Sequence, residues 1–117
     1  MPIPYATPPN IIGNYVYNWP TLNNGDDGQP AGIAGSGDRT VQVQGTFGAG
    51  GTVVIQGSLD GQTWYTLRDP IGNLLSFTGA GLKAVLENTL QIRPLVTAGD
   101  STTAIQVLIS VRRENNG

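Results

Sequence analysis

The sequence predicts an all-β protein: a compact antiparallel β-sandwich or jelly-roll-like barrel with an extended Pro/Gly-rich N-terminal arm. The first observation is composition, since only 12% of the residues are charged while Gly (17) and Pro (8) are frequent. Such a chain, also rich in Thr and Val, favours strands and turns over helices. The second is a series of short alternating segments separated by turn signals, which is typical of sandwiches and barrels.

The third observation is residues 52–67, TVVIQGSLDGQTWYTL, which read as a β-hairpin closed at Asp60-Gly61. Asp-Gly between two β-rich runs is a strong signal for a two-residue type I′ turn. That loop length pairs Gly57 with Trp64, so that Gly57 leaves room for the indole. A type I turn with a glycine bulge would instead shift the register by one and move Trp64 to the other face. With the two-residue loop, the expected core face holds Val53, Ile55, Leu59 and Trp64.

The N-terminal residues 1–37 hold six of the eight prolines and show no sustained periodicity. Each proline fixes φ and removes a backbone donor, so we expect an extended or turn-rich arm outside the core rather than a regular ladder. Its aromatic and aliphatic residues favour an arm ordered on its own domain or on a neighbouring subunit over the alternative of a solvated tail. Residues 14–19 alternate like a strand and could add an edge strand in cis or in trans.

We expect one sandwich domain over residues 38–113, followed by a polar tail at residues 114–117. Residues 41–47 alternate between apolar and polar, with a possible bulge at Gly45, and residues 48–51, 69–73 and 98–101 are turn-like. Residues 82–90 are ambiguous, because one or two helical turns would also fit them. Besides the hairpin, the expected strands span residues 41–47, 74–78, 83–88, 90–97 and 103–112.

The chain has no Cys and no His, which removes thiol nucleophiles, imidazole bases, zinc sites and disulfides from consideration. A formal charge of −2, without a basic stripe, makes nucleic acid an unexpected partner. No run is long and apolar enough to span a membrane, and the N-terminus lacks the pattern of a signal peptide. We therefore expect a protein that is made and kept soluble in a cytoplasm.

The carboxylates do not form a catalytic or metal-binding pattern. Nearly all of them fall in predicted turns, where Asp caps local backbone N–H groups, and no pair is marked as an acid and a base. Residues 24–28, NGDDG, resemble an oxygen-rich calcium loop but lack the spacing and terminal Glu of an EF-hand, so a polar turn is expected. We expect no enzyme activity, no metal and no cofactor.

A sandwich of this size has a small core, which rarely supplies more than ~3–5 kcal/mol without a staple. Disulfides are excluded, so oligomerisation or docking on a larger assembly remains as the source of additional stability. Prolines reduce the entropy lost when an arm is ordered, which suits binding through residues 1–37. A protein lacking residues 1–37 should then still fold but fail to attach to the larger assembly. The residues expected to contact a partner or a neighbouring subunit are Tyr5, Ile11, Ile12, Tyr15, Tyr17 and Trp19.

Residues 58–67, SLDGQTWYTL, resemble the S-x-D-G-x-x-W hairpin of discoidin-type or galactose-binding-like sandwiches and of small β-rich bacteriophage virion proteins. The overall plan is similar to that of phage capsid decoration (cement) proteins. This resemblance implies a structural protein, made in the host cytoplasm, that sits as a homotrimer on the capsid exterior and braces neighbouring major capsid proteins. It transfers no individual binding residues.

Two alternatives stay open. The first is a carbohydrate-binding β-sandwich module on a tail or surface structure, which would use exposed aromatic faces such as Trp19 or Tyr65. The second is a tail or neck component of the same virion, which differs from a decoration protein only in its location.

Overall fold

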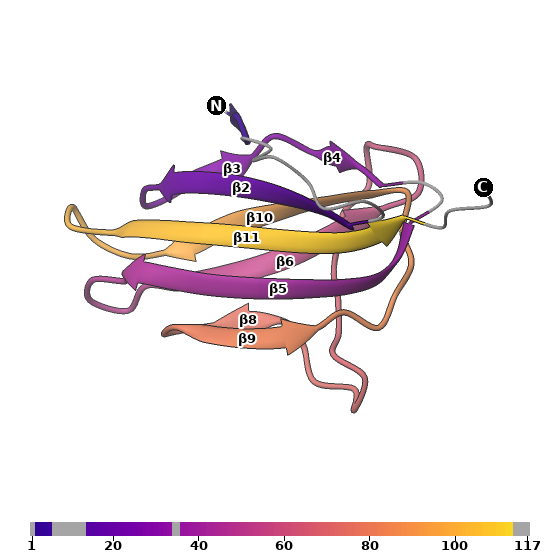
Figure 1. Cartoon of the computed structure of the whole chain (residues 1–117). Coiled ribbons are helices and arrows are strands. Elements are labelled where there is room, and N and C mark those ends of the chain that lie inside the picture. Colours follow the sequence, from indigo (N-terminus) through magenta and orange to yellow (C-terminus); the bar gives the residue numbers. More distant parts are fainter. Residues whose placement is uncertain (1, 6–13, 34–35, 114–117) are drawn as a thin grey trace.

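The computed structural model describes residues 2–5, 14–33 and 36–113, which form eleven strands in two sheets (Figure 1). All strand pairs except β1–β3 are antiparallel. The predicted all-β fold with antiparallel sheets, consistent with a β-sandwich, is thereby confirmed. None of the described segments is a helix that could cross a membrane.

Sheet A has seven strands, and its long members are β10 and β6. Its path runs through β1 (Pro2–Ile3), β3 (Asp27–Gly28), β10 (Gln91–Ala98), β6 (Thr52–Ser58) and β7 (Tyr65–Thr66). Two short strands pair off this path: β4 (Ala31–Gly32) with β10, and β8 (Ser76–Phe77) with β6.

Sheet B has four strands in the order β2-β11-β5-β9. These strands span the following residues: β2 (Asn14–Leu22), β11 (Ala104–Arg113), β5 (Ser36–Thr46) and β9 (Gly81–Ala84). Residues 82–90 form no helical turn. β9 ends at Ala84 and residues 85–90 belong to no strand, so the strand predicted at residues 83–88 is only partly present. Gly45 has a positive φ of 116°, but its pairing with Ile105 continues without a register shift, so the bulge predicted there is absent.

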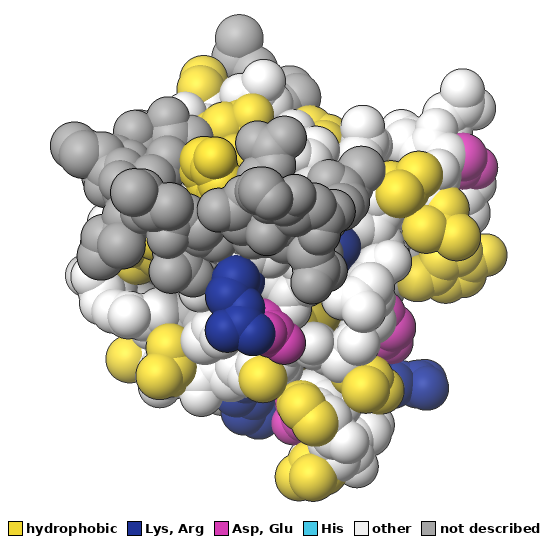
Figure 2. All heavy atoms as spheres, turned by 45° about the vertical axis from the view of Figure 1, so that its right-hand side comes forward, with side chains coloured by type: hydrophobic (Ala, Val, Ile, Leu, Met, Phe, Trp, Pro, Cys, Tyr) yellow, Lys and Arg dark blue, Asp and Glu magenta, His cyan; other side chains and the backbone are white. Residues whose placement is uncertain are grey.

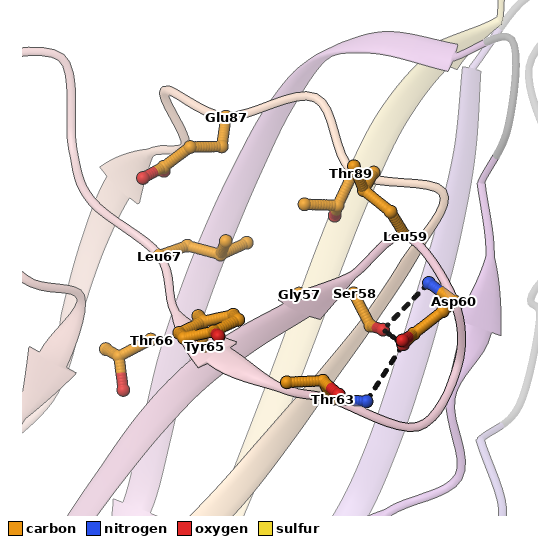
Figure 3. A pocket seen from close by; sticks show the side chains of 10 residues that line it. All are labelled: Gly57, Ser58, Leu59, Asp60, Thr63, Tyr65, Thr66, Leu67, Glu87 and Thr89. Carbon is orange, nitrogen blue, oxygen red and sulfur yellow. Dashed lines mark hydrogen bonds between the residues drawn. The ribbon is translucent and has the colours of Figure 1, made fainter.

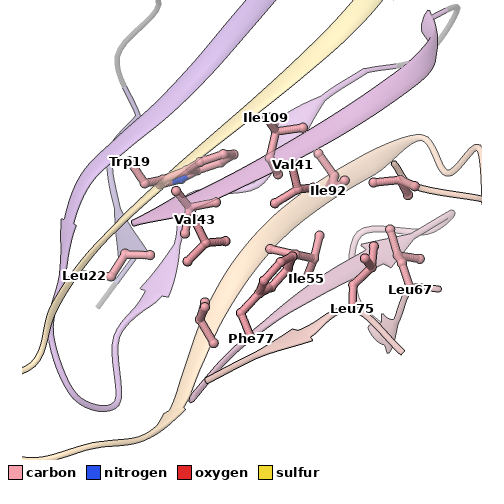
Figure 4. Close-up of a cluster of buried hydrophobic side chains, with 14 of the residues drawn as sticks. Trp19, Leu22, Val41, Val43, Ile55, Leu67, Leu75, Phe77, Ile92 and Ile109 are labelled. Atoms are coloured by element: carbon pink, nitrogen blue, oxygen red, sulfur yellow. The ribbon is translucent and has the colours of Figure 1, made fainter. Parts of the chain in front are cut away.

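The core lies between the sheets and follows from the two-residue periodicity of their long strands (Figure 4). In β11, every second residue from Ile105 to Val111 is at most 1% exposed. Val53 and Ile55 of β6 are fully buried, as predicted. Facing side chains include Val41 and Val43 from sheet B and Ile55, Phe77 and Ile92 from sheet A.

The N-terminal segment is part of the domain, so the expected arm outside the core is wrong for its described residues. β2 is an edge strand of sheet B and pairs in cis with β11. Trp19 and Leu22 are 0% exposed, and Ile33 is 1% exposed. Pro20 is tolerated because it lies on an edge strand, where the register with β11 shifts between Trp19 and Leu22. The predicted tail at residues 114–117 lies outside the described residues.

The central hairpin also differs from its expected register. Gly57 pairs with Tyr65 rather than Trp64, so the register is shifted by one, and the loop between β6 and β7 spans residues 59–64. Gly61 has a φ of 76° whereas Asp60 has no positive φ, which excludes a type I′ turn. Placing Leu59 and Trp64 in the core is therefore wrong. Leu59 is 69% exposed.

Trp64 lies on the opposite face, half-buried, with the Arg93 guanidinium 4.3 Å from its ring centroid. Arg93 is itself held by Gln56 and by Asp27, at 3.0 and 3.4 Å.

Candidate binding site

The loop after β6 is fixed by two side chains of its own sequence. The Ser58 hydroxyl accepts hydrogen bonds from the backbone N–H groups of Asp60 and Gly61, and it donates to Asp60 Oδ1 at 2.9 Å. The same Oδ1 accepts the N–H groups of Gln62 and Thr63 at 2.9 and 2.8 Å. The S-x-D-G-x-x motif is thus a self-capping loop, which explains its spacing.

These hydrogen bonds also set the charge of the loop. The backbone N–H groups of Thr63 and Gln62, followed by the Ser58 hydroxyl, lower the pKa of Asp60 to about 2. Asp60 is therefore a fixed anion at every physiological pH. Its second oxygen, Oδ2, accepts no hydrogen bond from the described residues.

A pocket of about 460 Å³ opens beside this loop, at the end of the sandwich (Figure 3). Its floor is the inner face of the β6–β7 pair. Tyr65 pairs with Gly57, and two residues further on, the Leu67 N–H donates to Ile55 O. Tyr65 and Leu67 therefore project to the same side as the buried Ile55. Leu67 is 3% exposed and Tyr65 is 70% exposed, so the core continues here into solvent.

Gly57 lets the side chains of Thr89 and Leu67 pack closely against the β6 backbone at the pocket. A Cβ at this position would lie 2.6 Å from Thr89 Oγ1 and 2.8 Å from Leu67 Cδ2. Sequence reasoning gave this glycine the role of making room for Trp64. With the register shifted by one residue, that room is taken by the side chains of Thr89 and Leu67, which line the pocket.

The remaining wall is the connection between β9 and β10, which Arg39 holds in place from β5. Its guanidinium donates to the backbone carbonyls of Glu87 and Thr89 and to the Thr89 hydroxyl. Arg39 is 2% exposed, and burial lowers its pKa from the usual value. Glu87 Oε1 accepts the N–H of Arg68 at 2.7 Å. No described donor contacts Glu87 Oε2.

The predicted contact residues are placed differently from what was expected. Trp19 is fully buried, and its Nε1–H donates to Gln29 O at 3.2 Å. The Tyr5 ring packs edge-on against Tyr17 and Trp19, with centroids 4.9 and 5.6 Å apart. Tyr15 is also half-buried against the core. The structure therefore brings these aromatic residues together within the chain, and Trp19 is excluded as a surface contact. The remaining two predicted contact residues, Ile11 and Ile12, lie outside the described residues.

Asp26, Asp69 and Asp100 cap turns, as predicted, whereas Asp27 and Asp38 lie in strands and form salt bridges with Arg93 and Arg112. Asp69 Oδ1 accepts the N–H groups of Ile71 and Asn73, and Asp26 Oδ2 accepts that of Asn23. Among the described residues, no group of three or more potential metal-binding side chains is found. The acidic run at residues 24–28 is a turn followed by β3.

Sequence reasoning missed Glu87 and Thr89, because they reach the pocket only through tertiary contacts. It identified Tyr65 as a surface or interface aromatic, and its 70% exposure confirms that it is on the surface. The shifted-register alternative was the signal that would have placed Tyr65 opposite Gly57.

Four exposed apolar side chains lie on the loop after β7, on β9 and on the segment that follows β9. We call them the apolar rim: Ile71, Leu74, Leu82 and Leu86. Leu74 bridges to Arg68, whose carbonyl accepts the N–H of Leu86, so these segments lie side by side. Their sequence neighbours Leu75 and Val85 point into the core instead. The exposed fractions in the rim are 83% (Ile71), 51% (Leu74), 65% (Leu82) and 52% (Leu86).

Comparison with known proteins identifies the fold. No family model matches the chain, and no curated protein sequence matches it significantly. The SPBc2 prophage-derived protein YomS has the same fold. Its crystal structure matches with a TM-score of 0.64 at 11% identity, over 88% of this chain and 97% of that chain. Two further solved structures match with TM-scores below 0.5. They are peruvianin-I, a cysteine peptidase from Thevetia peruviana latex (TM-score 0.48, 16% identity, 91% and 54% coverage), and a carbohydrate-binding module of Cellvibrio mixtus lichenase 5A (TM-score 0.35, 16% identity, 95% and 86% coverage).

Proposed function

We propose that this protein is a non-catalytic structural component of a bacteriophage virion: a capsid decoration protein that binds the outer capsid surface and braces neighbouring major capsid proteins. The observation that carries the proposal is the likeness to YomS, a prophage-derived protein whose chain is almost entirely covered by this single domain. The sequence resemblance to phage cement proteins points to the same class. At 11% identity the likeness itself concerns the fold alone.

The apolar rim is the surface that we assign to the capsid. On the face turned forward in Figure 2, hydrophobic side chains lie along the lower edge and at the right, interspersed with charged side chains of both signs. Ile71, at a loop tip, and Leu82, on the edge strand β9, are the most exposed members of the rim. Apolar side chains gathered on a loop and an edge strand suit burial against a protein partner. Trp19 has no part in this contact because it lies in the core.

Capsid occupancy tests this assignment. Particles of the phage that encodes the chain, stripped of this protein, would be incubated with the wild type or with the double variant Ile71→Ser/Leu82→Ser, and bound protein measured by co-sedimentation. Two lost apolar anchors should weaken attachment about tenfold or more. Leu59→Ser is the matched control, since Leu59 is equally apolar and 69% exposed but lies at the pocket. Full occupancy by the double variant would remove the rim from the proposal.

The assembly would be a homotrimer, as in the resembling family. Light scattering on the purified full chain gives its mass directly. A stable trimer supports subunits that associate before docking, whereas a monomer means that assembly requires the capsid surface as a template. Absence of the protein from purified particles would refute the structural role itself.

A further inference from the structure

The pocket beside residues 59–63 is not used by the proposed capsid contact. It combines an apolar floor with polar groups at its opening. Its volume of about 460 Å³ falls within the range of small-molecule sites, roughly 300–1,000 Å³. Figure 3 shows Asp60 and Glu87 at opposite sides of the opening, with Leu67 between them, Tyr65 below Leu67, and the Glu87 carboxylate at the outer edge of the pocket.

We propose that this pocket binds a neutral sugar ring, with the pyranose lying against Tyr65 and its hydroxyl groups bonded to Asp60 and Glu87. A pyranose is apolar on the faces made by its C–H groups and polar around its edge. Tyr65 supplies a flat apolar surface that is 70% exposed, next to the buried Leu67. The unused carboxylate oxygens, Asp60 Oδ2 and Glu87 Oε2, can each accept a hydrogen bond from a sugar hydroxyl.

The polar groups are already held in position before a ligand arrives. Asp60 is fixed by one hydroxyl and two backbone N–H groups on its other oxygen. Glu87 is fixed by the Arg68 N–H on Oε1 and by Arg39 on its carbonyl. Groups fixed in this way lose little conformational entropy when a ligand binds.

Charge selects the class of sugar. The lining contains two carboxylates and no Lys or Arg side chain. The nearby Arg39 guanidinium lies behind the wall, donating to Glu87 O and Thr89 O. An acidic sugar, such as a uronic or sialic acid, would face like charges without a compensating cation. The expected ligand is therefore a neutral hexose or N-acetylhexosamine, alone or at the end of a glycan.

This activity goes beyond the proposed capsid role and does not depend on it. It gives a position to the sugar-binding alternative raised by the sequence, with Tyr65 as its aromatic residue and without Trp19. A decoration protein with this pocket would present a glycan-binding site at the particle surface.

The test is a titration of the ¹⁵N-labelled full chain, observed by ¹H–¹⁵N NMR, with a panel of neutral and acidic mono- and oligosaccharides. Isolated sugars should bind with Kd values of about 1 mM. We expect the neutral sugars to change the amide chemical shifts of residues around Gly57, Tyr65 and Thr89 only. Their acidic counterparts should cause no such changes. The expected effect of Tyr65→Ala is a loss of affinity of about tenfold, whereas Tyr65→Phe retains binding because the ring remains.

Two further variants distinguish sugar binding in this pocket from sugar binding elsewhere on the protein surface. Glu87→Gln keeps the acceptor for the Arg68 N–H but removes the negative charge. It should therefore reduce the difference in affinity between neutral and acidic sugars. Ile71→Ser/Leu82→Ser, in the apolar rim, should leave sugar binding unchanged while reducing capsid occupancy. No shift with any neutral sugar of the panel, or equal binding by Tyr65→Ala, would overturn the proposal. Neither result bears on the capsid experiment.

Discussion

The two tryptophans give the sharpest test of the structure. The sequence predicted Trp64 in the core and Trp19 at a contact surface, whereas the structure buries Trp19 and leaves Trp64 half-buried. Trp19 is 0% exposed, donates to Gln29 O at 3.2 Å and packs against the Tyr5 ring. Truncating a core tryptophan to alanine costs about 3–5 kcal/mol. Domains of this kind are stable by only about 5–15 kcal/mol, so Trp19→Ala should remove much of the free energy of unfolding.

Trp64→Ala is the matched variant. This residue is half-buried, and the Arg93 guanidinium lies 4.3 Å from its ring centroid. A cation–π contact at such a site is worth about 0.5–2 kcal/mol. We therefore expect Trp64→Ala to lower the free energy of unfolding by about 1–2 kcal/mol, clearly less than Trp19→Ala.

Urea denaturation followed by circular dichroism measures both variants, since removing a tryptophan would disturb a fluorescence readout. Trp19→Phe is included because Trp19→Ala alone could prevent folding. It keeps most of the apolar contact but leaves Gln29 O without its donor, at a cost of about 1–3 kcal/mol. Equal effects of the two alanine variants, or a larger effect at Trp64, would refute the burial of Trp19 and the half-exposed position of Trp64.

Three further predictions follow from individual contacts. A Cβ at Gly28 would lie 2.5 Å from Pro94 Cδ and 2.6 Å from Trp19 Nε1, so Gly28→Ala should lower the free energy of unfolding by about 1–3 kcal/mol. Gly32→Ala, which meets nothing within 4 Å, should have little effect in the same denaturation experiment. The pKa of Asp60 is depressed to about 2, below its unfolded value of about 3.9, so its contribution to stability is present above pH 4 and lost as the pH falls toward 2. NMR titration of its carboxyl carbon should give that value, Asp60→Asn should abolish this part of the pH dependence, and a measured value near 4 would contradict the loop geometry. Deleting residues 1–22 removes β2 and Trp19, so calorimetry should show no cooperative unfolding, and an unchanged Tm would mean that this segment is dispensable after all.

The candidate pocket was only partly predictable from the sequence. The Ser58 and Asp60 contacts are local, and the motif that carries them indicated a tight turn. Glu87 and Thr89 join the pocket because Arg39, 48 and 50 residues away, holds their backbone carbonyls. Contacts between residues so far apart leave no local pattern.

By itself, the sequence determined the fold class and most of the strands. Strict alternation in residues such as Ile105 to Val111 specifies a strand with one buried face, because side chains of a strand point alternately to its two sides. Turn chemistry at residues 48–51 and 69–73 follows equally from local backbone preferences. These features need only neighbours in the chain.

Only the tertiary structure decided which strands pair and in which register. The prolines of residues 1–37 predicted an arm outside the core, and the alternation of residues 14–19 left open whether that segment pairs in cis or in trans. The structure pairs it in cis with β11 as an edge strand, where a local register shift accommodates Pro20 and Trp19 is buried. In the hairpin, a shift of one residue moved Trp64 away from the core and left a pocket above Gly57. The physical reason is that successive side chains of a strand point to opposite faces, so one residue of register exchanges inside and outside.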